Sequence, residues 1–273
     1  MRIEVSERMD DAPSGGAGEG PPFGTVAWAR ERGGKLNLTE QRRILLQGAA
    51  LQMKVWGQDL RRLFGLERLP PLPSPARLAI PDTSVAVRAA KLCADVSPQS
   101  LFNHCVRTYL WGSVLAEREN IPFDEEVLYV ACMLHDLGLT EYAPTSESEP
   151  CFAAKGGQAA ASFVGGLGWS PARQRRVADA ICQHVNPRVS REEPEAYLLQ
   201  AGAGVDVIGL RYHEIHPATV AEVLAENPRL KFKSVFGALW RKEAGARSGG
   251  VRTQFLSRWL AFEKRIRGTP FAE

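Results

Sequence analysis

The feature that most constrains the fold is an uninterrupted apolar run, residues 127–134 (VLYVACML). A helix that is apolar on every side is buried at the centre of an α-helical domain, because none of its faces suits water. The run ends at two adjacent ionisable residues, His135 and Asp136, and Gly138 supplies a stop signal shortly after them. The sequence therefore predicts a central helix over 124–136 with other helices packed around it.

The rest of the chain also reads as helix after helix. Apolar residues recur at helical spacing, and no stretch shows sustained period-two alternation. Asp124, Ser97-Pro98 and Ser170-Pro171 are typical helix starts. The expected helices span about 39–64, 81–95, 97–118, 124–136, 170–184, 194–210, 218–226, 233–244 and 251–266. The predicted fold class is all-α, a helical bundle with an added N-terminal helical segment.

Composition divides the chain into three parts. Residues 1–24 are rich in Gly, Pro and acidic groups, which predicts a disordered tail. Residues 25–75 hold an N-terminal helical segment, with Thr39 as its expected N-cap, and a stiff Pro-rich linker (PPLPSP). The main helical domain is expected over 76–273, with the N-terminal helix packed on it.

Charge and hydropathy exclude several classes of protein. A net charge of +3 is too small to favour nucleic acid or an anionic membrane. No apolar stretch reaches membrane-spanning length, and the N-terminus has no secretory h-region. The five cysteines form no CxxC pair, which favours free thiols in a reducing compartment. A cytoplasmic protein that binds a small molecule is expected, and a homo-oligomer is one option.

The His135-Asp136 pair breaks a local rule. The C-terminal end of a helix carries partial negative charge, which disfavours a carboxylate there, and burial raises that cost unless the charge is paired or binds a metal. Adjacent side chains on a helix diverge by about 100°, so the two can straddle one ion beyond the helix end. Taken alone, the pair is better explained by a hydrogen-bonded core histidine and a cap or turn aspartate than by a metal site.

Three further polar residues interrupt apolar helices in the same way: His104, His184 and Asp206. Singly, each is best explained as a hydrogen-bonded interior group, but chance explains the ordered series poorly. Gly202 and Gly204 weaken the helix around Asp206, and their small size would let another helix come close. Imidazole and carboxylate together form a reasonable ligand set for Zn, Fe or Mn.

This series resembles the H…HD…D pattern of the HD superfamily of metal-dependent hydrolases. The segments LFNHCVRTYLWG, FDEEVLYVACMLHDLGLT and AGAGVDVIGL are similar to a subgroup that includes cyanamide hydratase-like proteins. The resemblance implies one divalent metal, with Zn preferred over Fe or Mn, held by His104, His135, Asp136 and Asp206. Only His184 lies between the HD pair and Asp206, which favours a mononuclear site.

The resemblance also implies an activity. The metal would deliver hydroxide near neutral pH to a small substrate, as in the hydration of a nitrile of the cyanamide type. Asp136 would be both ligand and catalytic residue, and His184 would move protons. Arg107 and Lys155 would bind the substrate. An HD phosphohydrolase acting on a nucleotide or phosphodiester is the alternative reading.

One departure from the subgroup concerns residues 152–156 (FAAKG). Where similar proteins tend to carry acidic residues in a pattern like FExDG, this chain has Ala153 and Lys155. The change predicts a different substrate or a catalytically silent, metal-containing binding module. His213 and His216 have a spacing that could serve a metal, but they lie next to Pro217 and are expected to be surface or cap residues.

Overall fold

The computed structural model describes residues 20–64, 69–143, 151–246 and 251–273, and every regular element within these ranges is a helix. The α-helices are α1 (Val26–Arg32), α2 (Leu38–Leu63), α3 (Ser84–Val96), α4 (Gln99–Glu119), α5 (Glu125–Leu134), α6 (Phe152–Gly166), α7 (Pro171–Gln183), α8 (Pro194–Ile208), α9 (Pro217–Glu226), α10 (Phe232–Gly245), α11 (Arg252–Leu260) and α12 (Phe262–Arg267). Three short 3-10 turns are η1 (Pro75–Leu78), η2 (Leu137–Leu139) and η3 (Tyr212–Glu214). The all-α prediction is confirmed.

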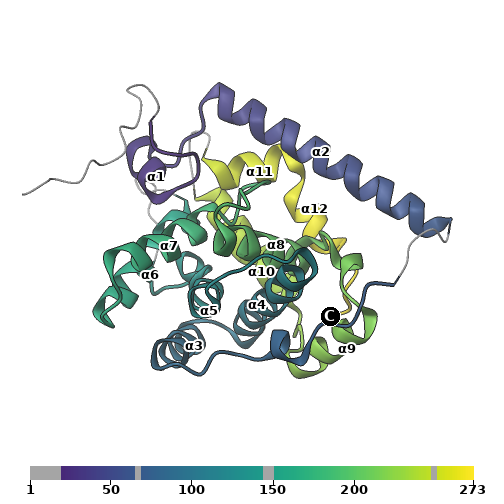
Figure 1. Cartoon of the computed structure of the whole chain (residues 1–273). Helices are drawn as coiled ribbons and strands as arrows, with labels where there is room; N and C mark the ends of the chain where they lie inside the picture. Colours follow the sequence, from purple (N-terminus) through teal and green to yellow (C-terminus); the bar gives the residue numbers. More distant parts are fainter. Residues whose placement is uncertain (1–19, 65–68, 144–150, 247–250) are drawn as a thin grey trace, which may run out of the picture.

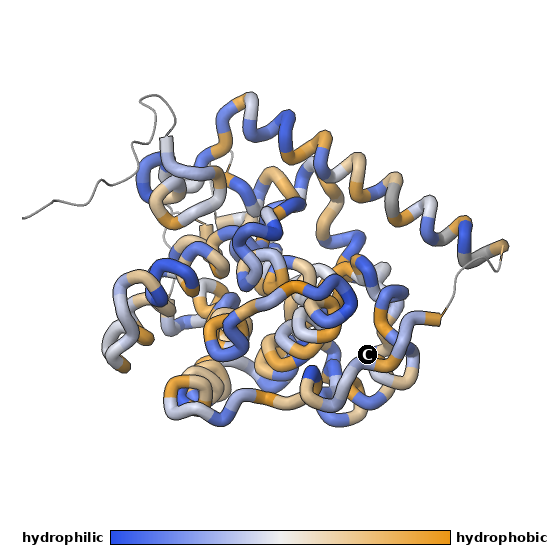
Figure 2. Tube along the Cα trace, in the orientation of Figure 1, coloured by the Kyte–Doolittle hydropathy of each residue, from blue (hydrophilic) through white to orange (hydrophobic). Residues whose placement is uncertain are grey.

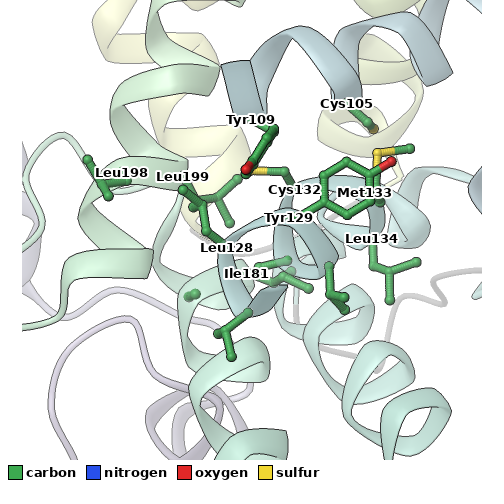
Figure 3. Close-up of a cluster of buried hydrophobic side chains, with 14 of the residues drawn as sticks. Cys105, Tyr109, Leu128, Tyr129, Cys132, Met133, Leu134, Ile181, Leu198 and Leu199 are labelled. Atoms are coloured by element: carbon green, nitrogen blue, oxygen red, sulfur yellow. The ribbon is translucent and has the colours of Figure 1, made fainter. Parts of the chain in front are cut away.

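Helix α5 lies inside the bundle, as its composition predicted (Figure 1). Its eight residues from 127 to 134 are each at most 3% exposed, and α3, α4, α7 and α8 pack around them. Figure 3 shows Leu128, Cys132 and Met133 of α5 among side chains from α4, α7 and α8. Each fully buried side chain of this size contributes roughly 1.5–3 kcal/mol, so α5 fixes the position of whatever follows it.

The helix starts follow capping chemistry. The side chains of Asp124 and Ser170 accept hydrogen bonds from the first turns of α5 and α7, as predicted. The predicted cap of the N-terminal helix, Thr39, is wrong by two residues. Asn37 accepts from the Glu40 amide at 2.8 Å, and Glu40 accepts from the Asn37 amide at 2.7 Å. This reciprocal pair satisfies both backbone donors, which Thr39 could not do from inside the helix.

The N-terminal segment shares a core with the rest of the chain. Val26 and Trp28 of α1 and Ile44 of α2 are buried with Phe152, Trp240 and other residues of α6, α10 and α11. The Val26 amide donates to Asp179 of α7 at 2.9 Å. The N-terminal segment is thus packed on the helical domain, as expected. The boundary at residue 75 stays a prediction about chain organisation.

Helix α2 packs on the molecule with one side only. It runs along one edge of the structure beside α11 and α12, and apolar residues alternate along it with polar ones (Figures 1 and 2). Leu46, Met53, Trp56 and Leu60 remain more than half exposed. The buried face of α2 is therefore narrower than the row of apolar residues along it. The helix continues through Gly57 without a break.

Two helices escaped prediction, and one predicted helix is divided. Helices α1 and α6 were not expected, because α6 contains four glycines and α1 is only seven residues long. The expected helix over 251–266 is broken between α11 and α12 at Ala261, whose φ is +48°. Of the tail predicted over 1–24, residues 1–19 lie outside the described ranges. Phe23, by contrast, packs edge-on against Trp28.

Other expectations from composition can be compared with the fold. Within the described ranges, no helix combines the length and apolarity needed to span a membrane. All five cysteines are buried and free, as expected. Residues 69–74 form no helix before η1, which fits the extended linker predicted at 70–75.

Candidate metal centre

Three potential ligands come from the adjacent helices α4 and α5. His104 lies within α4, and His135 and Asp136 follow directly after the last residue of α5. The end of α5 is held by close backbone contact with α6. A Cβ on Gly138 would lie 2.1 Å from the Phe152 carbonyl oxygen, so only glycine fits there. Gly138 therefore seats α6 against the His-Asp turn, a role beyond the predicted stop signal.

The three side chains converge on one point. His104 Nε2 lies 3.2 Å from His135 Nε2 and 3.6 Å from Asp136 Oδ2, and His135 Nε2 lies 3.4 Å from the same oxygen. Metal–nitrogen and metal–oxygen bonds of about 2.0–2.2 Å give ligand separations in this range for tetrahedral or octahedral angles. All three residues are at most 3% exposed. The triangle has the size that one divalent ion requires.

Hydrogen bonds fix which nitrogen of each imidazole is available. His104 Nδ1 lies 2.8 Å from Asp206 Oδ2, and His135 Nδ1 lies 2.7 Å from the Cys132 carbonyl oxygen. Both partners are acceptors, so we assign the proton of each neutral ring to Nδ1. Burial lowers the pKa of His104 and outweighs the opposing effect of Asp206. The lowered pKa favours the neutral ring. Two Nε2 lone pairs then face each other at 3.2 Å, an arrangement that a cation between them stabilises.

Asp136 supplies the clearest sign of a missing partner. It is 3% exposed, and neither carboxylate oxygen has a hydrogen-bond partner among the described residues. Leaving a buried carboxylate unpaired costs several kcal/mol, so such groups are normally neutralised, paired or bound to metal. Two imidazoles and one carboxylate with open positions form a donor set used for Zn and for non-haem Fe. The residues present therefore fit a single divalent metal.

Asp206 differs from its predicted role as a fourth ligand. Its Oδ2 accepts from His104 Nδ1 and Arg107 Nη2, both at 2.8 Å. Its Oδ1 accepts from Arg107 Nε at 2.8 Å, Trp111 Nε1 at 3.1 Å and Arg229 Nη1 at 3.3 Å. Burial alone would raise the pKa of Asp206, but the charge and hydrogen bonds of Arg107 hold that pKa well below its usual range. Asp206 thus orients His104 from behind.

The residues that hold Asp206 were only partly visible in the sequence. Trp111 and Arg229 were not predicted to serve the site. Arg107 and Trp111 follow His104 at spacings of three and seven residues, so all three lie on one face of α4. Three hydrogen-bond donors on one face of an otherwise apolar helix could have been used to predict a buried anionic partner. Arg229 precedes α10 and offers no comparable pattern.

Close helix packing places Asp206 opposite these donors. A Cβ on Gly202 of α8 would lie 2.1 Å from the Thr108 carbonyl oxygen of α4. Asp206 follows Gly202 by one turn and therefore faces the same helix. The predicted close approach is confirmed at Gly202. A Cβ on Gly204 would instead meet Leu210 at 3.3 Å.

His184 lies beside the triangle at the end of α7. Its ring centroid is 4.9 Å from that of His135, nearly perpendicular to it. Its Nδ1 donates to the Ile181 carbonyl oxygen at 2.6 Å, which leaves Nε2 as an acceptor. Burial, followed by the charge of His135, holds the pKa of His184 well below its ordinary value. His184 is therefore a neutral ring at neutral pH, with Nε2 able to accept a hydrogen bond.

A cavity of about 90 Å³ adjoins these residues. His104, His135, Asp136 and His184 contribute to one part of its wall. Most other lining side chains are apolar, including Phe152, Val207, Phe236, Trp240, Leu260 and Phe262. The triangle therefore opens on a small, largely apolar chamber.

The two predicted substrate-binding residues do not line this cavity. Arg107 is completely buried, and besides Asp206 it binds the carbonyl oxygens of Asn227 and Pro228. Lys155 lies half-buried on α6 and is absent from the described cavity wall. Their positions do not fit direct contact with a substrate in this chamber. His216 caps α9, as expected, and His213 lies half-buried in η3.

Comparison with known proteins agrees with this geometry. Residues 101–201 match the model of the HD domain family, a range that includes His104, His135, Asp136 and His184. Cyanamide hydratases DDI2 and DDI3 from Saccharomyces cerevisiae are each 27% identical to the chain over 173 residues, 61% of this chain and 76% of theirs. Residues 101–201 are thus similar to the HD domain family, and 61% of the chain is similar to proteins named cyanamide hydratases.

Proposed function

We propose that this protein is a metal-dependent hydratase that adds water to the carbon of a small neutral substrate, with a nitrile as the reacting group. The observation that supports this most strongly is the buried triangle of His104, His135 and Asp136 at the wall of a largely apolar cavity. A divalent metal bound there supplies a Lewis acid that lowers the pKa of water to near neutrality. The relatives named cyanamide hydratases support the choice of reaction.

The chain's own residues divide the remaining work. His104 and His135 present Nε2, and Asp206 and the Cys132 carbonyl oxygen keep both rings turned correctly. His184 Nε2 takes a proton from the attacking water and returns one to the substrate nitrogen. The apolar wall excludes bulk water, which strengthens every charge interaction within the site.

The charge of the cavity disfavours the phosphohydrolase alternative. Arg265 is the lining residue with a permanent positive charge, and its Nε and Nη2 already donate to the Leu260 carbonyl oxygen and to Gln52. A phosphate ester brings one or two negative charges, which phosphate sites meet with Arg, Lys or helix N-termini. A neutral substrate needs none of these groups.

The direct test is a substrate screen of metal-loaded wild type and Asp136→Ala. The screen covers cyanamide, simple nitriles, nucleotides and phosphodiesters, with amide or urea formation and phosphate release as readouts. We expect hydration in wild type and none in Asp136→Ala. Phosphate release without hydration would favour the phosphohydrolase. No turnover of any compound by metal-loaded protein would favour a silent binding module.

A further inference from the structure

We infer that the substrate is an organonitrile with a short aliphatic group, rather than cyanamide itself. The inference rests on the proposed function, and it concerns the walls of the cavity rather than its metal-binding corner. The reaction is R–C≡N + H₂O → R–CO–NH₂. The water oxygen bonds to the nitrile carbon while C–N π bonding is lost, and both water hydrogens end on nitrogen.

The walls outside the ligand set are built mainly from apolar and aromatic side chains. The Trp240 ring lies 4.2 Å from that of Phe262 and 6.1 Å from that of Phe152, centroid to centroid. Phe236 lies 6.3 Å from Trp240 on the same helix. These packed rings form a preorganised surface that gains free energy from contact with hydrocarbon.

Outside the metal-binding corner, the polar side chains of the wall each make at least one hydrogen bond. Asn186 Oδ1 accepts from Arg252 Nη1 at 2.8 Å, and Arg265 binds Leu260 and Gln52 as described above. Gln200 Nε2 donates to the Pro187 carbonyl oxygen at 3.4 Å. The amino group of cyanamide would lose its hydrogen bonds to water against such a wall, which is unfavourable. An alkyl group loses none.

The volume sets the size of that group. A cavity of about 90 Å³ is several times larger than the roughly 10–15 Å³ that one bound water needs on the same measure. This leaves room for a few carbon atoms beside the nitrile. The substrate class is thereby narrowed to small aliphatic nitriles.

The apolar wall comes largely from outside the HD match. The ligands and His184 lie within residues 101–201, but Val207, Trp240, Phe262 and Leu51 of α2 lie beyond it. A Cβ on Gly48 would meet Leu260 Cδ2 at 2.9 Å, so the glycine lets α2 lie directly on this wall. The part of the chain shared with the family supplies the chemistry, and the added helices select the substrate.

The experiment measures kcat/KM for acetonitrile, propionitrile and butyronitrile, with cyanamide as the reference substrate. The reactivity of the nitrile carbon changes little along the alkyl series, so differences report contact with the wall. We expect kcat/KM to rise roughly three- to fourfold per methylene. In parallel, calorimetry with acetamide, propionamide and butyramide measures binding of the corresponding products, and affinity should rise by a similar factor.

A pair of variants on one helix tests the wall itself. Leu51→Asn places an amide in the lining and should reduce the butyronitrile preference over acetonitrile by roughly threefold or more. Leu60→Asn makes the same change at a residue of α2 that is 56% exposed and outside the cavity wall, and should leave the preference unchanged. Circular dichroism and metal content establish that both variants are folded and loaded.

The outcomes separate the inference from the proposed function. Hydration of cyanamide with a flat or falling alkyl series would overturn the inference and leave the function standing. Absence of hydration for every nitrile, with amide affinity still rising per methylene, would overturn the reaction and retain the apolar specificity. A rising series that Leu51→Asn does not change would assign the selectivity to other residues and overturn the role of this wall.

Discussion

Asp136 and Asp206 are buried carboxylates in opposite environments. Asp206 accepts five hydrogen bonds from four side chains, whereas Asp136 has no hydrogen-bond partner in the part of the chain that the structure describes. Local rules indicated that a buried Asp136 needed a charged partner or a metal, because its place at a helix end is unfavourable for a carboxylate. They could not tell whether Asp206 is a metal ligand or a hydrogen-bond partner of His104. That difference depends on contacts with Trp111 and Arg229, which lie in other parts of the chain.

The first prediction concerns Asp136→Asn. Without metal, this variant should be more stable to urea than metal-free wild type by about 1–3 kcal/mol, because an unpaired buried acceptor charge is removed. Its metal affinity should fall sharply with the lost ligand. Urea unfolding with a chelator and elemental analysis give the two values. A less stable metal-free variant would show that Asp136 is stabilised by the protein alone.

Asp206→Asn should behave in the opposite way. Arg107 and Arg229 would lose a buried counter-charge, so the free energy of unfolding should fall by about 3–5 kcal/mol. Metal affinity should fall by about 10–100-fold through loss of the His104 support, rather than be abolished. The same urea and metal measurements apply. Complete loss of metal in a folded variant would identify Asp206 as a ligand.

His184→Gln isolates proton transfer from metal binding. We expect kcat for the hydrated substrate to fall by about 10²–10⁴-fold, with metal content equal to that of wild type. Steady-state kinetics and elemental analysis measure both. If metal content falls along with kcat, His184 is a ligand and the triangle is incomplete.

The helices show where local pattern predicts structure and where it does not. Helix α5 was predictable because its whole surface is apolar, and α7 because Ser170 and Pro171 mark its start. Helix α6 was missed because Gly156 and Gly157 lower its intrinsic helix propensity. These glycines allow close helix packing, since a Cβ on Gly157 would lie 2.6 Å from the Ala178 carbonyl oxygen of α7.

A matched pair of glycine substitutions tests this view of the elements. Gly57→Ala in α2, with no atom within 4 Å of its Cβ, should stabilise the protein by about 0.5–1 kcal/mol. Gly202→Ala in α8 should destabilise it by about 3 kcal/mol or more, because its Cβ collides with the backbone of α4. Urea unfolding measures both changes. A neutral Gly202→Ala would mean that α4 and α8 do not approach so closely.

For the whole molecule, metal should act as a structural ligand as well as a cofactor. The site joins α4 to the end of α5, so metal binds the folded state far better than the unfolded one. A chelator should lower the Tm of wild type by roughly 10 °C if the free metal concentration before chelation is about 1,000 times the Kd. Asp136→Asn serves as the control in differential scanning calorimetry, and its Tm should not respond. An equal shift in both proteins would place the metal elsewhere.

The architecture as a whole was predictable in outline. The ordered series from His104 to Asp206 located the site, and the all-α class followed from periodicity. The cavity wall was not predictable, because Leu51, Trp240 and Phe262 come together only through the packing of α2, α10 and α12. Arg107 and Lys155 were expected at the substrate for their charge, whereas burial beside Asp206 and placement on α6 direct them away from the cavity.

The most direct test of this account is anomalous diffraction from crystals of the metal-loaded protein. The account predicts one ion at about 2.0–2.2 Å from His104 Nε2, His135 Nε2 and an oxygen of Asp136. Asp206 should still accept from His104 Nδ1. An ion bound away from these three atoms, or bound directly to Asp206, would contradict the account.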